Sequence, residues 1–441
     1  MMNKKLMALA VGAALTVPGL ALAQASNVQV YGLLDVRVDQ MKFTQSTSGV
    51  AELTNHHVTT NTVPNRIGFR GTEDLGAGMS AFFQIESQVF TDAKQDNGAA
   101  GVPNALVGGR PSFVGLRGAS WGEVSLGLQD TVYGDVWKST WNVGPVAGHN
   151  GIIMGNKNSS GGLASPNCTN LVSGNTNKIT TPTGAVSTIC TNNAASATSF
   201  DRRLSNTVIY RSPVIAGAKF AALLTANGMK EPSSSTPAGT AQSNPMIASY
   251  SLTWAAGPFA LAGGYERHTG LLAGGSTATI RDAKDTGLTL GGRFNYGKGL
   301  LGLGWERLKY GATGNTAATD NGFTLTNWAA QGTFNVTPAD IIALEYSKTD
   351  GAKSCGTGLS STAATPTCGT GTGAKMTTLS YNHDFSKRTM IYAMYTKIDN
   401  NAGASYYFIA GPTNNNNGGT GGGLLAGVDV TLLALGVRHS F

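Results

Sequence analysis

After its first 23 residues, the sequence lacks any apolar run long enough to cross a membrane as a helix. A spanning helix needs about 18 consecutive apolar residues, and no later stretch approaches that length. Charged residues are also scarce, at 12% of the chain, while 60 of the 441 residues are glycine and the mean hydropathy is −0.06. This composition fits an ordinary soluble enzyme poorly. If the protein lies in a membrane, only a closed β-barrel satisfies its backbone hydrogen bonds.

Cysteine is nearly absent, and its four copies form two local pairs, Cys168 with Cys190 and Cys355 with Cys368. Each pair lies in a stretch rich in Gly, Ser and Thr. Spacings of 22 and 13 residues, without a histidine close by, are not typical of zinc ligands. We therefore expect two disulfides in loops of an exported protein, and no metal site. The connectivity of the four thiols stays open at this point.

Histidine is scarce as well, and the sequence shows no nucleophile beside a base and an orienting carboxylate. His383 and Asp384 are adjacent on a predicted strand, so their side chains point to opposite faces. We predict that the protein is not an enzyme and needs no cofactor. The isoelectric point of about 9.1 could indicate nucleic-acid binding, but the basic residues are scattered and the chain is exported. No nucleic-acid partner is predicted.

Residues 1–23 have the features of a removable signal peptide. Lys4 and Lys5 form a positive start, an apolar stretch follows, and a small-x-small cleavage site ends at Ala23. The alternative is a membrane anchor, which Gly12 and Pro18 within the stretch disfavour. The mature chain is then expected to be residues 24–441, a single domain, and the loss of two lysines lowers the formal charge from +7 to about +5.

Both ends of the mature chain alternate between apolar and polar residues. At the C-terminus, one face carries Leu433, Leu435, Val437, His439 and Phe441, and the other Ala434, Gly436, Arg438 and Ser440. Near the N-terminus, Val28, Val30, Leu34, Val36 and Val38 alternate with Gln29, Tyr31, Leu33, Asp35, Arg37 and Asp39. Charged residues on one face of such a strand require that this face be in contact with water. A strand of this kind is typical of a wall with lipid on one side and water on the other.

The same pattern predicts sixteen strands, at residues 28–39, 65–71, 79–90, 110–118, 121–129, 203–212, 218–225, 249–254, 259–267, 286–296, 300–310, 327–335, 340–349, 375–385, 389–399 and 429–441. Short links, at 72–78, 119–120, 213–217, 255–258, 297–299, 336–339 and 386–388, alternate with long polar ones. This alternation puts all tight turns at one rim. It indicates an all-β, 16-stranded antiparallel transmembrane barrel with short periplasmic turns and long extracellular loops.

A barrel of this size leaves an aqueous lumen, whereas eight strands can be filled by side chains. The longest link, 130–202, follows the fifth strand. Structureless loops of that length are usually functional or disordered. We expect it to fold into the barrel and narrow the pore.

The sequence resembles the general diffusion porins of Gram-negative outer membranes, most closely their beta-proteobacterial branch. The resemblance rests on VQVYGLLDV, NRIGFRGTEDLGAGMSAFFQIE, RPSFVGLRGASWGEVSLGLQDT, RRLSNTVIYRSP, LSYNHDFSKRTMIYAMY and the terminal GVRHSF, in that order along the chain. It implies a homotrimer in the outer membrane, in contact with lipid and lipopolysaccharide, with the third loop folded inward. It also implies that the strand ending in Phe441 presents a signal to the outer-membrane insertion machinery.

In that family, a cluster of wall arginines faces acidic groups on the inserted loop, and the matching positions here are Arg66, Arg110 and Arg203. If Phe69 and Phe113 face lipid, the two-residue period of a strand sends Arg66 and Arg110 into the lumen. The alternative is that these arginines lie near a rim. Further lumen-facing candidates are Arg37, Arg70 and Glu86.

The predicted loop departs from the family pattern because its only acidic residue between 131 and 200 is Asp135, whereas Lys138, Lys157 and Lys178 are present. We assign Asp135 and Lys138 to the constriction. Ion selectivity follows fixed charge at a narrow site, so this composition predicts a preference for anions. The alternative is that the lysines lie on a solvated outer part of the loop.

The favoured function is passive diffusion of small hydrophilic solutes and ions through a water-filled pore. The main alternative is a substrate-specific outer-membrane channel. An adhesin or phage receptor would use the Gly/Asn-rich segment 411–423, but that role leaves the interior charges unexplained.

Overall fold

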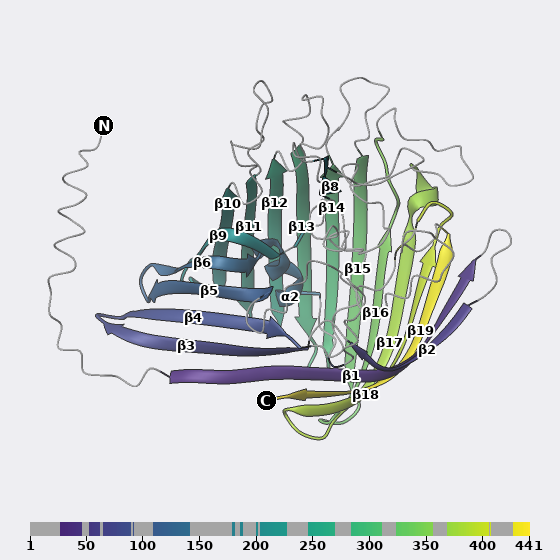
Figure 1. Ribbon diagram of the computed structural model, residues 1–441, viewed down its shortest axis with the longest axis horizontal. Coiled ribbons are helices and arrows are strands. Elements are labelled where there is room, and N and C mark those ends of the chain that lie inside the picture. Colours follow the sequence, from purple (N-terminus) through teal and green to yellow (C-terminus); the bar gives the residue numbers. More distant parts are fainter. Residues whose placement is uncertain are drawn as a thin grey trace.

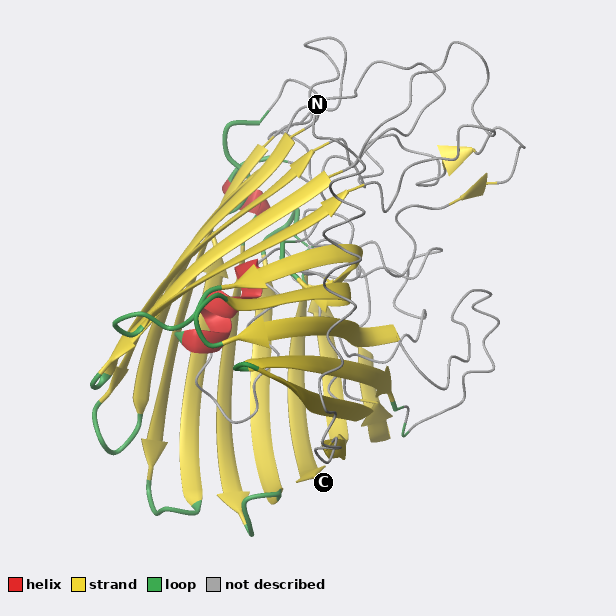
Figure 2. Ribbon diagram, turned by 90° about the vertical axis from the view of Figure 1, so that its left-hand side faces the viewer, coloured by secondary structure: helices red, strands yellow, loops and turns green. Residues whose placement is uncertain are grey.

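The computed structural model describes residues 27–45, 53–61, 65–89, 91, 109–141, 179–180, 186–187, 200–201, 203–226, 246–269, 284–310, 323–355, 368–404, 406 and 427–441. Within them, one antiparallel sheet closes on itself as a barrel (Figure 1, Figure 2). Its strands are β1 (Asn27–Gln45), β2 (Leu53–Asn61), β3 (Arg66–Gly76), β4 (Met79–Gln88), β5 (Gly109–Gly118), β6 (Gly122–Asp130), β9 (Arg203–Arg211), β10 (Ala218–Ala226), β11 (Met246–Ala256), β12 (Phe259–Thr269), β13 (Lys284–Asn295), β14 (Leu300–Tyr310), β15 (Phe323–Asn335), β16 (Asp340–Thr349), β17 (Ala374–Asp384), β18 (Thr389–Asn400) and β19 (Val428–Ser440). A separate hairpin joins β7 (Ile179–Thr180) to β8 (Val186–Ser187).

The barrel has sixteen strand positions because β2 and β3 occupy one position between them. The first part of β1, Asn27 to Leu33, pairs with β3, and the part from Val36 to Phe43 pairs with β2. On its other side β1 pairs with β19, which closes the cylinder. The predicted sixteen-stranded barrel is therefore confirmed. None of the helices in the described ranges is long and apolar enough to span a membrane.

The prediction was wrong where it ended the first strand at residue 39 and treated 40–64 as a loop. The strand continues to Gln45, and β2 follows. The reason is an inversion of the pattern: Met41 and Phe43 are buried on the inner face, whereas Gln40 and Lys42 are exposed outside. An apolar-inside strand does not match the template of a wall between lipid and water, so alternation alone missed this part.

The predicted sidedness of the strands is borne out. In β19, Leu435 has 64% of its surface exposed and points outward, whereas its neighbour Ala434 is 1% exposed. Asp35, Arg37 and Asp39 of β1 are buried on the inner face. Charged residues thus line the interior, and apolar residues form the outer belt.

The predicted short links join neighbouring strands at one rim, which in Figure 1 runs from the β3–β4 turn at the left to the lower ends of β11–β16. Several of them need backbone that favours glycine, such as Gly257 and Gly297 with φ of 54° and 87°. Phe441 lies at the same rim, and its backbone exchanges hydrogen bonds of 2.9 and 3.1 Å with Gly32 of β1. Most of the predicted long links lie outside the described residues.

The interior is not uniformly polar. A buried apolar cluster fills the inner face at the end of β1 and along β17–β19; its members include Met41, Phe43, Met376, Tyr392, Ile398, Val430 and Leu432. A second cluster brings Tyr133 and Phe200 from the predicted loop against Leu308, Tyr310 and Phe323 of the wall. Part of the cylinder is therefore packed, and the polar hollows described below lie elsewhere.

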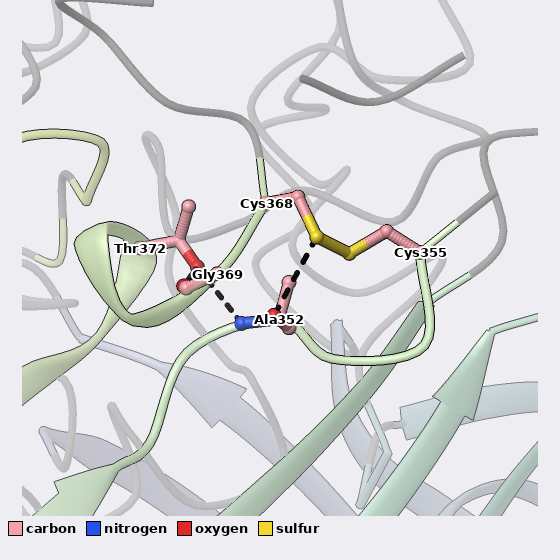
Figure 3. Close-up of a disulfide and its surroundings, with 5 residues drawn as sticks. All are labelled: Ala352, Cys355, Cys368, Gly369 and Thr372. Atoms are coloured by element: carbon pink, nitrogen blue, oxygen red, sulfur yellow. Dashed lines mark hydrogen bonds between the residues drawn. A yellow bond between two sulfur atoms is a disulfide. The ribbon is translucent and has the colours of Figure 1, made fainter. Parts of the chain in front are cut away.

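A disulfide joins Cys355 to Cys368 just beyond β16 (Figure 3). The segment is also held by hydrogen bonds of the Ala352 backbone with Gly369 and Thr372. This pair is one of the two predicted local bridges. Cys168 and Cys190 lie outside the described residues.

Candidate pore constriction

The described part of the predicted inserted loop lies on the inner wall of the barrel. It contains a 3₁₀ turn η1 (Val132–Gly134) and a short helix α2 (Asp135–Ser139), and it continues to Trp141. These elements contact β11, β12 and β13 (Figure 1). Val132, Val136 and Trp141 are buried, because each packs its apolar side chain between the loop and the wall.

Glycines on the inner face of the wall provide the seat for this segment. Leu301 and Leu303 of β14 point outward. The alternate residues Gly302 and Gly304 therefore face inward, where both lie against Trp141. Gly264 of β12 similarly faces Val136: a Cβ there would lie 2.8 Å from the valine Cγ2. The glycine-rich strands thus allow the loop to approach the wall backbone closely.

Polar contacts fix the loop in this seat. The Tyr133 backbone N–H donates to Ser249 Oγ at 2.9 Å, and the Tyr133 hydroxyl donates to Glu306 Oε2 at 2.8 Å. Burial raises the pKa of the Tyr133 hydroxyl well above its usual value, and the Glu306 carboxylate adds to this shift. Tyr133 therefore stays protonated and keeps donating to the wall. Trp137 Nε1 also donates to Asp201, at the far end of the loop.

Arg66 and Arg110 meet at a single carboxylate, that of Glu86. Arg66 Nε lies 3.4 Å from Glu86 Oε2, and Arg110 Nε bonds to Oε1. The Tyr31 hydroxyl donates to the same group at 3.0 Å. Two guanidinium groups share one carboxylate, so this cluster carries one net positive charge.

The premise that Phe113 faces lipid is wrong. Val114 and Leu116 point outward, so Phe113 lies on the inner face, where its ring meets that of Phe82 edge-on with centroids 6.1 Å apart. Strict alternation would then send Arg110 outward. Instead, Arg110 and Pro111 together oppose Glu86 in a β-bulge between β4 and β5, which directs Arg110 to the inner side. Phe69 is exposed, as assumed.

Asp130 and the loop residues form a second group of charges. Arg203 Nε lies 2.9 Å from Asp130 Oδ1, and Lys138 Nζ lies 3.9 Å from Oδ2 of the same carboxylate. Asp135 does not contact any of the three predicted arginines; among the described residues, its ion-pair partner is Arg211. Arg211 also lies 3.6 Å from Glu123.

Arg211 is a site residue that sequence reasoning missed. In a regular strand the eight-residue spacing from Arg203 would place both arginines on one face, but a β-bulge between Leu204 and Thr207 interrupts the period. Arg211 faces inward because it alternates regularly with the buried Ile209. Of the other candidates, Arg37 is 3% exposed and pairs with Asp39 at 2.9 Å. Arg70 is exposed, and its Nε donates to Gln29 at 2.8 Å. Lys157 and Lys178 lie outside the described residues.

The opposite wall holds carboxylates that the sequence did not single out as a group. Glu266, Asp285, Glu306 and Glu345 face inward from β12 to β16, and each is at most 2% exposed. Phe200 stacks on His268, which bonds to Glu266 at 2.8 Å, so packing covers part of this acidic group. Burial separates these negative charges from the open hollows near the arginines.

An apolar outer belt, a charged inner wall and sixteen closed strands define the class of transmembrane β-barrels with an interior path. The model of the family described as Gram-negative porin matches residues 8–404. The chain therefore belongs to the Gram-negative porin family and is an outer-membrane protein. Porins are channel proteins and not enzymes, in agreement with the absence of a catalytic constellation in the sequence.

Individual relatives are more distant. Outer membrane porin protein 32 of Delftia acidovorans is 38% identical over 126 residues, which cover 29% of this chain and 31% of that protein. The alignments thus span about a third of the length of such curated relatives. The solved anion-selective porin from Comamonas acidovorans covers 94% of this chain and 100% of its own, with 20% identity and a TM-score of 0.62. A trimer form of OmpT from Vibrio cholerae has 13% identity over 95% of this chain and all of its own, with a TM-score of 0.53.

Proposed function

We propose that the protein forms a water-filled channel for passive diffusion of small hydrophilic solutes and ions, with a preference for anions. The observation that carries this proposal is the placement of the Thr131–Trp141 segment on the inner wall of a sixteen-stranded barrel, beside open polar hollows. One such hollow, of about 260 Å³, is lined by Asp135, Lys138, Arg211 and Lys219, among others. Passive diffusion through such a pore requires no catalytic residues.

Two features of the interior support a preference for anions. The Arg66–Arg110–Glu86 cluster has an excess positive charge. The carboxylates of β12–β16 are buried, so an ion in the path does not contact them directly. The anion-selective porin of Comamonas acidovorans shares the fold, although at 20% identity it supports only the architecture. Fixed charge at a narrow site sets selectivity, so these two arginines, Arg66 and Arg110, favour anion entry.

We also propose the remaining features of the mature protein. Residues 1–23 are removed as a signal peptide, and the barrel assembles as a homotrimer, as the trimer form of OmpT does. Phe441 serves recognition by the insertion machinery, the tight turns face the periplasm, and lipid and lipopolysaccharide contact the outer belt. Cys168 and Cys190 form the second loop disulfide.

The test is the reversal potential of the purified protein in a planar bilayer under a gradient of potassium chloride. Anion preference is expected, and replacing Arg66, Arg110 or Arg203 with Ala is expected to reduce it, because each change removes a positive charge from the constriction. A cation-preferring wild-type channel contradicts the proposed selectivity. Unchanged selectivity in all three variants contradicts the assignment of the constriction.

The alternative, a substrate-specific channel, has one structural observation in its favour: Tyr31, Phe82 and Phe113 are aromatic rings on the inner wall. Liposome-swelling rates for neutral sugars of increasing size distinguish the two. A general pore excludes them by size alone, whereas a specific channel admits one solute out of proportion to its size.

A further inference from the structure

Most inner-wall arginines near the constriction have a carboxylate partner. Arg66 and Arg110 share Glu86, Arg203 pairs with Asp130, and Arg211 pairs with Asp135. Arg70 and Arg117 are different. Within the part of the chain that the structure describes, neither has an acidic oxygen within ion-pair distance, and both side chains are held by neutral groups.

Arg117 is fixed by three neutral contacts. Its Nε donates to Ser80 Oγ at 3.0 Å, one terminal nitrogen donates to Thr72 Oγ1 at 2.9 Å, and the guanidinium lies 5.1 Å from the centroid of the Phe82 ring. A guanidinium has five N–H donors, and these contacts use two of them. The side chain is exposed, so its other donors are accessible to solvent.

Arg70 repeats this arrangement on the neighbouring strand. Its Nε donates to Gln29 Oε1, and its guanidinium lies 5.0 Å from the centroid of the Tyr31 ring. Arg70 and Thr72 are on the same face of β3, about 7 Å apart along the strand. Arg117 bonds to Thr72, so both side chains lie along the inner face of β3, with Arg70 directed towards β1. Both positive charges are therefore exposed and held by neutral groups, with no acidic oxygen in ion-pair contact among the described residues.

A hollow of about 490 Å³ opens beside Arg117, towards the rim with the tight turns, and Arg211 and Lys219 also line it. Its acidic lining residue is Glu123, which lies across from Arg117 on one side and Arg211 on the other. The hollow beside α2 shares Arg211 and Lys219 with this one, so the two adjoin. A positive path thus leads from the inserted loop towards the turns.

We propose that Arg70 and Arg117, with Lys219, form a second anion site on the tight-turn side of the constriction, suited to small multivalent oxyanions of phosphate chemistry. This inference rests on the proposed pore function and specifies one class of its solutes. Guanidinium groups bind planar faces of oxyanions through paired N–H donors, which chloride cannot use in the same way. The neutral contacts already immobilise both side chains, so binding loses little rotamer entropy.

The experiment uses inorganic phosphate as the probe in single-channel recordings at constant ionic strength. Phosphate is expected to reduce the chloride current of the wild type in a saturable manner. Arg70→Gln and Arg117→Gln are each expected to raise the half-inhibitory concentration roughly three- to tenfold, since each removes a charge-assisted contact in a hydrated site. Arg307→Gln is the matched control: Arg307 lies exposed on the outer face of β14, and its loss should change nothing.

The outcomes separate this site from the pore function. Absence of any conductance overturns the proposed function and this inference with it. A conducting channel with no saturable effect of phosphate, or with unchanged inhibition in both variants, overturns the site alone. If a variant inserts poorly, ³¹P line broadening of phosphate by the detergent-folded wild type and by the variants provides a second measurement. No broadening with the wild type rejects the site.

Discussion

At the scale of single residues, charge compensation decides what an arginine does in this wall. Arg66, Arg110 and Arg70 all face inward, yet the first two share Glu86 whereas the third bonds to a neutral amide. Comparison with a known family and the two-residue period of a strand predicted which arginines face the interior. It could not predict their partners, because Glu86 and Arg110 meet only through a bulge between β4 and β5.

Replacing Glu86 with Gln is expected to increase anion preference. The change removes the negative charge that Arg66 and Arg110 share, while the amide still accepts the Tyr31 hydroxyl hydrogen bond. A unit charge about 4 Å from an ion in water is worth about 1 kcal/mol, so the permeability ratio of anions to cations should rise roughly fivefold. Reversal potentials in a salt gradient measure this ratio.

The control for this change is Glu73→Gln. Glu73 lies on β3 with the side-chain direction of the exposed Phe69, so it faces away from the lumen, and its loss should leave the ratio unchanged. A shift of Glu86→Gln towards cations would show that the shared carboxylate does not restrain the two arginines.

At the scale of elements, the strands were predictable and the seat of the inserted loop was not. A strand with lipid on one face and water on the other alternates between apolar and polar residues. Most strands of the barrel could therefore be predicted from this alternation and from the lengths of the links. The tail of β1 was missed because its apolar residues turn inward. The inward glycines of β14, Gly302 and Gly304, were visible only as glycines within a strand; their partner Trp141 comes from a segment more than 150 residues away in the chain.

Gly302→Ala is expected to displace the inserted segment. A Cβ at Gly302 would lie 2.9 Å from the backbone oxygen of Trp141 and closer still to its Cα, so the loop backbone must move into the lumen. Overpacking of this kind costs about 1–3 kcal/mol, and a displaced loop narrows the path, so single-channel conductance should fall. Conductance and thermal unfolding of the folded protein check both effects.

Gly292→Ala makes the same chemical change on the adjacent strand. There the new Cβ would meet Leu261 Cδ2 at 3.5 Å, an ordinary contact on the outer side, so conductance should match the wild type. If both alanine variants conduct like the wild type, Trp141 does not need the Gly302 surface as its seat.

At the scale of the whole molecule, the first and last strands must meet for the wall to have no open edge. Sequence analysis predicted closure from the need to satisfy every backbone hydrogen bond in a membrane and from the shared design of the two ends, and the pairing of β1 with β19 confirms it. The side chains that lock this seam were not predicted. Arg438 of β19 bonds twice to Asp35 of β1, at 2.9 and 2.7 Å, and the Tyr392 hydroxyl of β18 donates to the same carboxylate at 2.7 Å.

Asp35→Asn is expected to weaken the seam and with it the entire barrel. Asp35 is 2% exposed, and the change leaves the Arg438 charge without its carboxylate in a largely enclosed site. Breaking a buried ion pair costs about 3–5 kcal/mol; the partial exposure of Arg438 puts the expected loss near the lower limit, about 3 kcal/mol. Because a barrel unfolds as a unit once its edges separate, the loss should appear as a lower denaturant midpoint for the whole β signal.

Glu73→Gln, which removes a carboxylate far from the seam, should unfold like the wild type. Equal midpoints for Asp35→Asn and the wild type would mean that backbone pairing between β1 and β19 holds the cylinder closed without this ion pair.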